Sequence, residues 1–274
     1  MVVSDMLQLV EGLLSGIQVR RVGVSFGGHV HNGQILRSLH VPGWAEYPLE
    51  AQLREALEGV DEVCIANDAN ASALGEWRFG AGQGTASMLF ITVSTGIGGA
   101  IVLDGKLWPG ATGMAGEIGH MQIVADGPEC SCGQNGCLEV LAAGPAISRR
   151  AEALGVTPIS PNSSQQQATL TAHAVAQLAN QGDPLAKRAL LECAHYFGIG
   201  VANAVTLLDI ERVVIGGGVS RAGALWWDTV CSVVHDRVLP RQQAVEIVNS
   251  ALGEYEGVWG AVALVIDQIT RPKE

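Results

Sequence analysis

The chain has 274 residues, of which 48% are hydrophobic, and its mean hydropathy is +0.26. That composition can fill a sizeable core in one large or two smaller domains, so we expect a globular protein. Its 16 basic and 27 acidic residues give a net charge of -11 and a pI near 5.0, which disfavours nucleic acid and anionic membranes as partners.

The first residues have the pattern of an amphipathic helix. They lack a basic flank, unlike a signal peptide, and their apolar side chains share one helical face: Val3, Met6, Leu7, Val10, Leu13 and Leu14. Residues 79–103 carry no formal charge and are long enough to span a membrane, but their glycine, serine and threonine content favours two strands, 88–93 and 99–103, around a glycine turn. We therefore expect a cytoplasmic protein.

Many of the 35 glycines follow β-rich runs. A strand followed by a glycine turn is predicted in residues 20–28, 88–99 and 212–220, an arrangement that lets backbone amides approach a phosphate or a sugar. A tight turn without a ligand is the alternative for any one of them. Three such turns in one chain, one of them with Ser94 and Thr95, favour the binding of nucleotide phosphates.

Helical patterns alternate with these strands, which predicts an α/β fold. They cover residues 49–59, 70–80, 138–155 and 184–209. The Ser-, Gln- and Pro-rich stretch 158–170 is expected to be an exposed loop between helices rather than a domain boundary.

Three cysteines crowd one short loop after a histidine. The spacing His120-x9-Cys130-x-Cys132-x4-Cys137 lets three thiolates and one imidazole bind a single zinc ion tetrahedrally. Four protein ligands leave no open position, so the metal is expected to be structural. The alternative is a cluster of reduced core thiols or disulfide-forming cysteines, which the polar, glycine-rich sequence disfavours. The other cysteines are expected to be ordinary buried thiols: Cys64, Cys193 and Cys231.

A second group of polar residues follows an apolar strand at residues 65–76, where a helix begins. Asp68 could simply cap that helix. Because ligands bind at strand ends in α/β proteins, Asp68 could instead accept a proton from a substrate hydroxyl. Glu117 and Glu139 bracket the cysteine loop and could hold sugar hydroxyls, although each alone could be an ordinary surface or ion-paired residue.

Five motifs in this order resemble the ROK family of bacterial sugar kinases and sugar-responsive repressors, and most closely its glucokinases. They are NDANASALGE (67–76), TVSTGIGGAIV (92–102), GMAGEIGHM (113–121), CSCGQNGCLE (130–139) and VVIGGGVS (213–220). The likeness runs from about Arg21 to Ala263 and implies the actin-like, hexokinase-type ATPase fold, with two α/β domains around a cleft, usually in a homodimer. The expected domains are residues 1–84 with the C-terminal helix 258–274, and residues 85–257 with the zinc loop and nucleotide motifs.

The resemblance implies an ATP-dependent hexose kinase that uses Mg²⁺ and phosphorylates a sugar 6-hydroxyl. Asp68 would be the catalytic base. The other sugar hydroxyls would be held by Asn67, Glu117, His120 and Glu139, with His120 turning one ring nitrogen to the zinc and the other to the sugar. The ATP phosphates would face Ser94, Thr95, Gly96, Gly98 and Gly99, and the adenosine Gly216, Gly217 and Gly218.

The sequence departs from the family pattern at its N-terminus, where the D-x-G-G-T-K phosphate hairpin and about three strands have no counterpart before the first helix. A start site assigned too late, or a shortened chain, is our interpretation, with a catalytically inactive sugar binder as the alternative. We expect the chain to bind a hexose but to turn it over more slowly than an extended form.

Two other kinds of protein are less favoured. A ROK repressor would need a helix-turn-helix, and none precedes residue 20; a zinc-knuckle nucleic-acid binder would need basic and aromatic residues near the cysteines. His40 and Ala143 stand where many family members have Asn and Ser, which leaves the choice of hexose open, although GEIGH and CLE resemble glucokinases.

Overall fold

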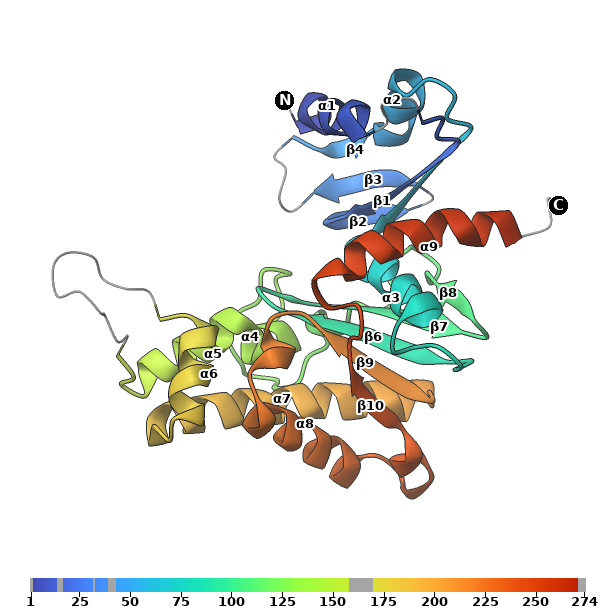
Figure 1. Ribbon diagram of the computed structural model, residues 1–274. Coiled ribbons are helices and arrows are strands. Elements are labelled where there is room, and N and C mark those ends of the chain that lie inside the picture. Colours follow the sequence, from blue (N-terminus) through green and yellow to red (C-terminus); the bar gives the residue numbers. More distant parts are fainter. Residues whose placement is uncertain (1, 14–16, 32, 39–42, 158–169, 271–274) are drawn as a thin grey trace, which may run out of the picture.

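The computed structural model describes residues 2–13, 17–31, 33–38, 43–157 and 170–270. His40, Leu14 and nearly all of the predicted loop at 158–170 lie outside these residues. The described chain forms an upper N-terminal part and a larger lower part, with two helices between them (Figure 1).

The N-terminal part contains two small sheets and two helices. Strands β1 (Arg21–Phe26) and β5 (Glu62–Asn67) are parallel, whereas β2 (Gly28–His31), β3 (Gln34–Ser38) and β4 (Ala45–Tyr47) form an antiparallel sheet. Helices α1 (Val2–Leu13) and α2 (Leu49–Ala56) pack on their apolar core.

The predicted apolar face of α1 is partly correct. Val3, Met6, Leu7 and Val10 pack against the N-terminal core. Leu13 was expected on the same face but is 78% exposed, because it is the last residue of α1 and lies past the turns that contact the core.

The larger part is built on a five-stranded sheet in the order β10-β9-β6-β7-β8. Its strands are β6 (Met88–Val93), β7 (Ile97–Leu103), β8 (Lys106–Trp108), β9 (Arg212–Gly216) and β10 (Glu246–Asn249). The β6-β9-β10 pairings are parallel and the β6-β7-β8 pairings antiparallel. The two residues between β7 and β8, Asp104 and Gly105, both have positive φ (50° and 70°), as an Asp-Gly hairpin turn requires.

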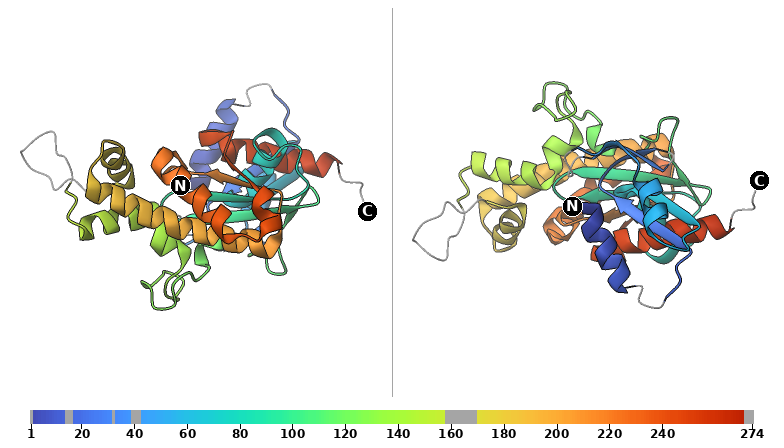
Figure 2. Two further views of the ribbon diagram at one scale, coloured as in Figure 1. Left: turned by 90° about the horizontal axis from the view of Figure 1, so that it is seen from below. Right: turned by 90° about the horizontal axis from the view of Figure 1, so that it is seen from above.

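Alternate residues of the central strands face opposite sides of this sheet, as strand geometry dictates. Met88 and Phe90 belong to a cluster beneath α3 (Asp68–Phe79), whereas Leu89 and Ile91 join the main core on the other side. That second side is covered by helices (Figure 2), which are α4 (Leu138–Ala142), α5 (Gly144–Ala153), α6 (Ala172–Asn180), α7 (Pro184–Leu208) and α8 (Ala224–Arg237). Within the described residues, α7 alone has the length and apolar composition to cross a membrane, and its buried residues form part of this core.

The helix predicted at 138–155 is instead two helices, α4 and α5. Ala143, between them, has extended backbone (φ −68°, ψ 168°), and Pro145 occupies the first turn of α5. Proline has no N–H to donate to the preceding turn and its ring clashes with it, so one continuous helix cannot pass through this point. The helices predicted at 49–59, 70–80 and 184–209 correspond to α2, α3 and α7.

Helix α3 and the last helix, α9 (Glu256–Thr270), form the layer between the two parts (Figure 1). α9 packs along α3 and against β1 and β5, while α3 also packs on β6 and β7. The two helices approach closely at Gly75 and Gly260, where a Cβ on Gly75 would lie 2.8 Å from the Gly260 nitrogen. The last helix of the chain therefore returns to the first strand.

Candidate functional site

The predicted zinc ligands come together in the structure. The ligand atoms of His120, Cys130, Cys132 and Cys137 all lie within 4.8 Å of one another. His120 ends a short 3-10 helix (Ile118–His120), and Cys137 immediately precedes α4, so the loop 121–137 is held at both ends by elements that pack in the core.

The spacing of these atoms fits a tetrahedral zinc ion. Zn–S and Zn–N bonds of about 2.3 and 2.0 Å imply edges of about 3.8 Å between two sulfurs and about 3.5 Å between sulfur and nitrogen. The Cys132 and Cys137 Sγ atoms are 3.6 Å apart, and the Cys130 Sγ lies 3.7 Å from His120 Nδ1. The ligand set of one imidazole and three thiols is that of structural zinc sites.

Two of these thiols differ in acidity. The backbone N–H of Gln134 lowers the pKa of the Cys132 thiol, whereas burial raises the pKa of the Cys137 thiol to about 12. Zinc binds thiolates, so loading the site would release protons. All six cysteines are free, and Cys193 is buried as expected, but Cys64 and Cys231 are only partly buried, which corrects the prediction for those two.

His120 connects the cysteines to a carboxylate. Its Nδ1 faces Cys130, and its Nε2 lies 4.0 Å from an oxygen of Glu117. Glu117 lines a small cavity together with Asn67, and the rest of its wall comes from β2, Asn70, Gly99 and residues 113–115. The two ring nitrogens of His120 thus point to the two groups of residues that the sequence associated with zinc and with sugar.

The structure separates the roles of Asn67 and Asp68 at the start of α3. Asn67 is the N-cap: its side-chain oxygen accepts hydrogen bonds from the amides of Ala69 (2.9 Å) and Asn70 (3.3 Å), and its Nδ2 donates to the carbonyl of Gly28 (2.9 Å). Asp68 is exposed, and one oxygen accepts from the Ala69 amide at 2.9 Å. Because Asn67 caps the helix, the alternative in which Asp68 is its cap is wrong.

The glycine turn between β6 and β7 lies next to Asp68. A Cβ on Gly98 would lie 3.5 Å from that of Ala69, and Ser94 and Thr95 are exposed at the tip of the turn. Gly99 packs against the backbone of Gly116, two residues before the 3-10 helix Ile118–His120 begins. The turn is therefore in contact with both the Asp68 helix and the segment that leads to His120.

Glu139, in the first turn of α4, holds this turn from the opposite side. Its Oε2 accepts a hydrogen bond from the Ile97 amide at 2.9 Å, and a Cβ on Gly96 would lie 2.6 Å from the same oxygen. Glycine at position 96 leaves the room that the carboxylate needs. Glu139 therefore connects α4, which follows the zinc loop, with the glycine turn, a role that the sequence did not indicate.

A cavity of about 1000 Å³ opens beside this turn. Ser94, Thr95 and Gly218 line it, together with the start of α5 and residues of α6. Gly217 has φ +85° and packs on the backbone of Val93, which brings the turn after β9 alongside the turn after β6. Gly216 instead faces Glu256 and a second cavity of about 380 Å³, so the three glycines 216–218 do not all face the large cavity.

Sequence reasoning missed several residues near these sites. His29, Asn70 and Met114 line the small cavity with Asn67 and Glu117, and Arg149 and His173 line the large one. Asn70 and Met114 stand inside two of the family motifs, which could have indicated them, whereas only their position in the fold identifies His29, Arg149 and His173. Ala143, where many family members have Ser, is buried at the break between α4 and α5.

The chain matches the family model described as "ROK family" over residues 2–268. It is 37% identical to a glucokinase of Halalkalibacterium halodurans, over 90% of this chain and 77% of that protein. It is also 33% identical to a xylose repressor of Caldicellulosiruptor bescii, over 84% of this chain and 58% of the repressor.

The structure is similar to that of a ROK family glucokinase from Streptomyces griseus in complex with glucose and AMPPNP. The TM-score is 0.78 at 31% identity, and the match covers 95% of this chain and 86% of the other.

Proposed function

The chain belongs to the ROK family, and from this premise we propose that it is an ATP-dependent hexose kinase that phosphorylates the 6-hydroxyl of glucose or a related sugar. The predicted actin-like ATPase fold is confirmed, since the match to a ROK glucokinase structure extends over nearly the whole chain. Glucose and an ATP analogue are bound in that structure, which supports the same two ligand classes here.

One observation carries the proposal: Asp68 stands between two groups of polar residues. Its neighbour Asn67 lines the small cavity with Glu117, and its other neighbour, Ala69, packs against the glycine turn at Gly98. An exposed carboxylate at this junction could accept the proton of a sugar hydroxyl while that oxygen attacks a phosphate held at the turn. We propose Asp68 as this base, and Asn67, Glu117, His120 and Glu139 as contacts to the other hydroxyls.

The turn at 94–99 and the glycines 216–218 are proposed to bind the nucleotide. Phosphoryl transfer needs mainly alignment and charge stabilisation, which backbone amides at a glycine turn provide, and Mg²⁺ would arrive bound to ATP. The cavity of about 1000 Å³ beside Ser94 and Thr95 supports this proposal, because it is large enough for a nucleotide. Ser94 to Gly99 would meet the phosphates, and Gly216 to Gly218 the adenosine.

Zinc would have a structural role in this enzyme. His120, Cys130, Cys132 and Cys137 would hold the ion, whose bonds would order the loop 121–137. A fixed His120 ring would in turn present its other nitrogen on the side of Glu117. A cytoplasmic location, where thiols remain reduced, and a homodimeric state belong to the same proposal.

The test is a panel of hexoses assayed with ATP and Mg²⁺, using the parent chain and Asp68→Asn. We expect phosphorylation of glucose by the parent and a loss of about a thousandfold or more in Asp68→Asn, with the sugar Kd changed by less than about tenfold, because the amide keeps the shape but accepts no proton. Asp236→Asn, the same change on the exposed side of α8, is the matched control. Turnover by Asp68→Asn within a few-fold of the control would exclude Asp68 as the base.

The second candidate is a sugar-binding regulator without kinase activity, which the similarity to a xylose repressor favours. A regulator would bind a sugar in calorimetry but form no sugar phosphate in the same panel. The two proposals therefore give opposite results in one experiment.

A further inference from the structure

Glu76, near the C-terminal end of α3, is a fully buried carboxylate. Its Oε2 accepts hydrogen bonds from the amides of Ala81 (2.7 Å) and Ala251 (3.2 Å). Its Oε1 accepts from the Ser250 hydroxyl (2.6 Å) and the Leu252 amide (2.9 Å). Among the described residues, no lysine or arginine forms an ion pair with it, so these four donors compensate the cost of burying the charge.

The four donors belong to the two segments that connect α3 and α9 with the large sheet. Ala81 lies between α3 and β6, and residues 250–252 lie between β10 and α9. These segments are more than 160 positions apart in the sequence. Glu76 is 5 positions from Ala81 but 174 to 176 positions from its partners 250–252. One side chain therefore joins both connections to a single helix.

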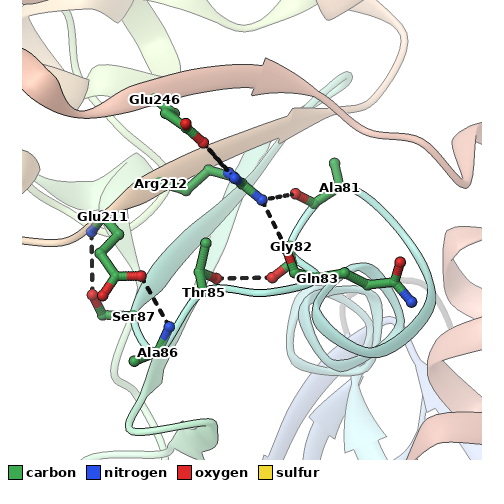
Figure 3. A network of polar contacts seen from close by, with 9 residues as sticks. All are labelled: Ala81, Gly82, Gln83, Thr85, Ala86, Ser87, Glu211, Arg212 and Glu246. Atoms are coloured by element: carbon green, nitrogen blue, oxygen red, sulfur yellow. Dashed lines mark hydrogen bonds and ion pairs between the residues drawn. The ribbon is translucent and has the colours of Figure 1, made fainter.

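The connection between α3 and β6 is also attached to the large sheet (Figure 3). Arg212, at the start of β9, donates from Nη1 to the carbonyls of Ala81 (2.6 Å) and Gln83 (3.1 Å), and its guanidinium pairs with Glu246. Ala81 is thus held through its N–H by Glu76 and through its C=O by Arg212. At the other connection, Asn249, the last residue of β10, is followed directly by Ser250.

We infer that Glu76 is a positioning residue: it fixes α3 to both connecting segments and so sets where Asp68 stands relative to the glycine turn at 94–99. The inference rests on the proposed kinase function of Asp68. It gives a role to a motif residue, the last of NDANASALGE, to which the sequence assigned none.

The geometry explains why a small loosening would matter. Eight residues separate Glu76 from Asp68 on one helix, a distance of about 12 Å at about 1.5 Å per residue. A tilt of about 5° at Glu76 would move the Asp68 carboxylate by about 1 Å, a misplacement that can cost about a hundredfold in rate. Of the four proposed sugar contacts, Asn67 caps α3 and would move with Asp68, whereas Glu117, His120 and Glu139 lie on other elements and would be affected less.

Position 76 requires a side chain whose two terminal atoms both accept hydrogen bonds. In Glu76→Gln one of the two oxygens becomes an NH₂ group, which faces N–H donors and leaves them unpaired in a buried site. The change therefore targets the connecting segments while it conserves side-chain volume. Glu58→Gln, the same change at an exposed residue, is the matched control.

The experiment compares the parent, Glu76→Gln and Glu58→Gln in three measurements: hydrogen exchange by mass spectrometry, glucose phosphorylation with ATP and Mg²⁺, and glucose binding by calorimetry. For Glu76→Gln we expect faster exchange confined to segments 80–87 and 250–255, a kcat lower by about tenfold to about a hundredfold, and a glucose Kd within about threefold of the parent. If this variant does not fold, Ser250→Ala should give the same pattern with smaller changes, because it removes one of the four donors to Glu76, together with the Ser250 contacts to Glu256 and to the Gly253 amide.

Two outcomes would overturn the inference. In the first, Glu76→Gln matches Glu58→Gln in exchange and turnover. In the second, exchange rises throughout the chain and glucose binding falls as much as kcat, which would indicate a role in general stability alone. If the parent phosphorylates no hexose, the proposed function fails, and the hydrogen exchange of Glu76→Gln then tests the positioning of α3 by itself. Faster exchange confined to the two segments supports that role, and unchanged exchange refutes it.

Discussion

Replacing Cys132 by serine should separate zinc binding from core packing. The Cys132 side chain is exposed, whereas Cys137 is fully buried, so Cys132→Ser removes a ligand without opening a cavity. Met121 and Ile123 pack against the main core, but the rest of the loop 121–137 is supported mainly by hydrogen bonds within the loop: two isolated β-bridges, turn hydrogen bonds and two donated by the Gln122 side chain. Its order should therefore depend on the metal.

The expected magnitude follows from the four-ligand geometry. A structural zinc site contributes about 10–16 kcal/mol of binding free energy, so one ligand of four corresponds to about 3 kcal/mol. This is about a hundredfold in zinc affinity. If the loss is fully coupled to folding, a chain of this length should melt about 5 °C lower.

The assay is zinc content by mass spectrometry together with thermal unfolding, on the parent, Cys132→Ser and the control Cys231→Ser. Cys231 is a partly buried thiol on α8, away from the cluster, so its replacement should leave one zinc per chain. We expect Cys132→Ser to lose zinc during dialysis against a chelator that leaves the parent loaded. A parent that purifies without zinc, or a Cys132→Ser variant with unchanged zinc content and melting temperature, would refute the reasoning.

Three further predictions concern the glycine turn, α3 and a partly buried carboxyl. Gly96→Ala should lower kcat/KM for ATP by about tenfold, because the new Cβ displaces the Glu139 carboxylate from the Ile97 amide; Gly12→Ala, in open space on α1, should leave it unchanged. Asn67→Ala should lower the free energy of unfolding in urea by about 1 kcal/mol, since the Asn70 amide loses its cap while the Ala69 amide keeps only Asp68 as acceptor; an unchanged free energy would exclude the cap. Burial raises the pKa of Glu256, so its ionisation opposes folding and the free energy of unfolding falls as pH rises above the ordinary glutamate pKa. Glu256→Gln should therefore be more stable than the parent at about pH 7 but not at about pH 4. A gain in stability that does not depend on pH would contradict this.

Local sequence determined most of the elements and the metal cluster. Strands 88–93 and 212–216 follow from short apolar runs bounded by glycine, and α7 from a long apolar periodicity. The His120, Cys130, Cys132 and Cys137 spacing predicted a cluster because the three cysteines lie within one short loop, where few conformations keep them apart. Family motifs supplied the fold, which composition and periodicity limited only to the α/β class.

Tertiary structure decided the details that depend on distant partners. The sequence could not decide between Asn67 and Asp68 as the cap of α3, because either side chain can accept hydrogen bonds from helix amides. Periodicity also could not show that Leu13 is exposed, because a helical pattern does not indicate where the surface that the helix packs on ends. The break between α4 and α5, by contrast, could have been read from the sequence, because a helix tolerates proline in its first turn but not in its interior, so Pro145 marks the start of a new helix.

The clearest case is Glu76, which the sequence offers as one more polar residue in a helix. Its four hydrogen-bond donors come from Ala81 and from residues 250–252, and only folding brings the second group to it. A charge can be buried only where enough donors converge, and that convergence is a property of the packed chain and not of any short segment.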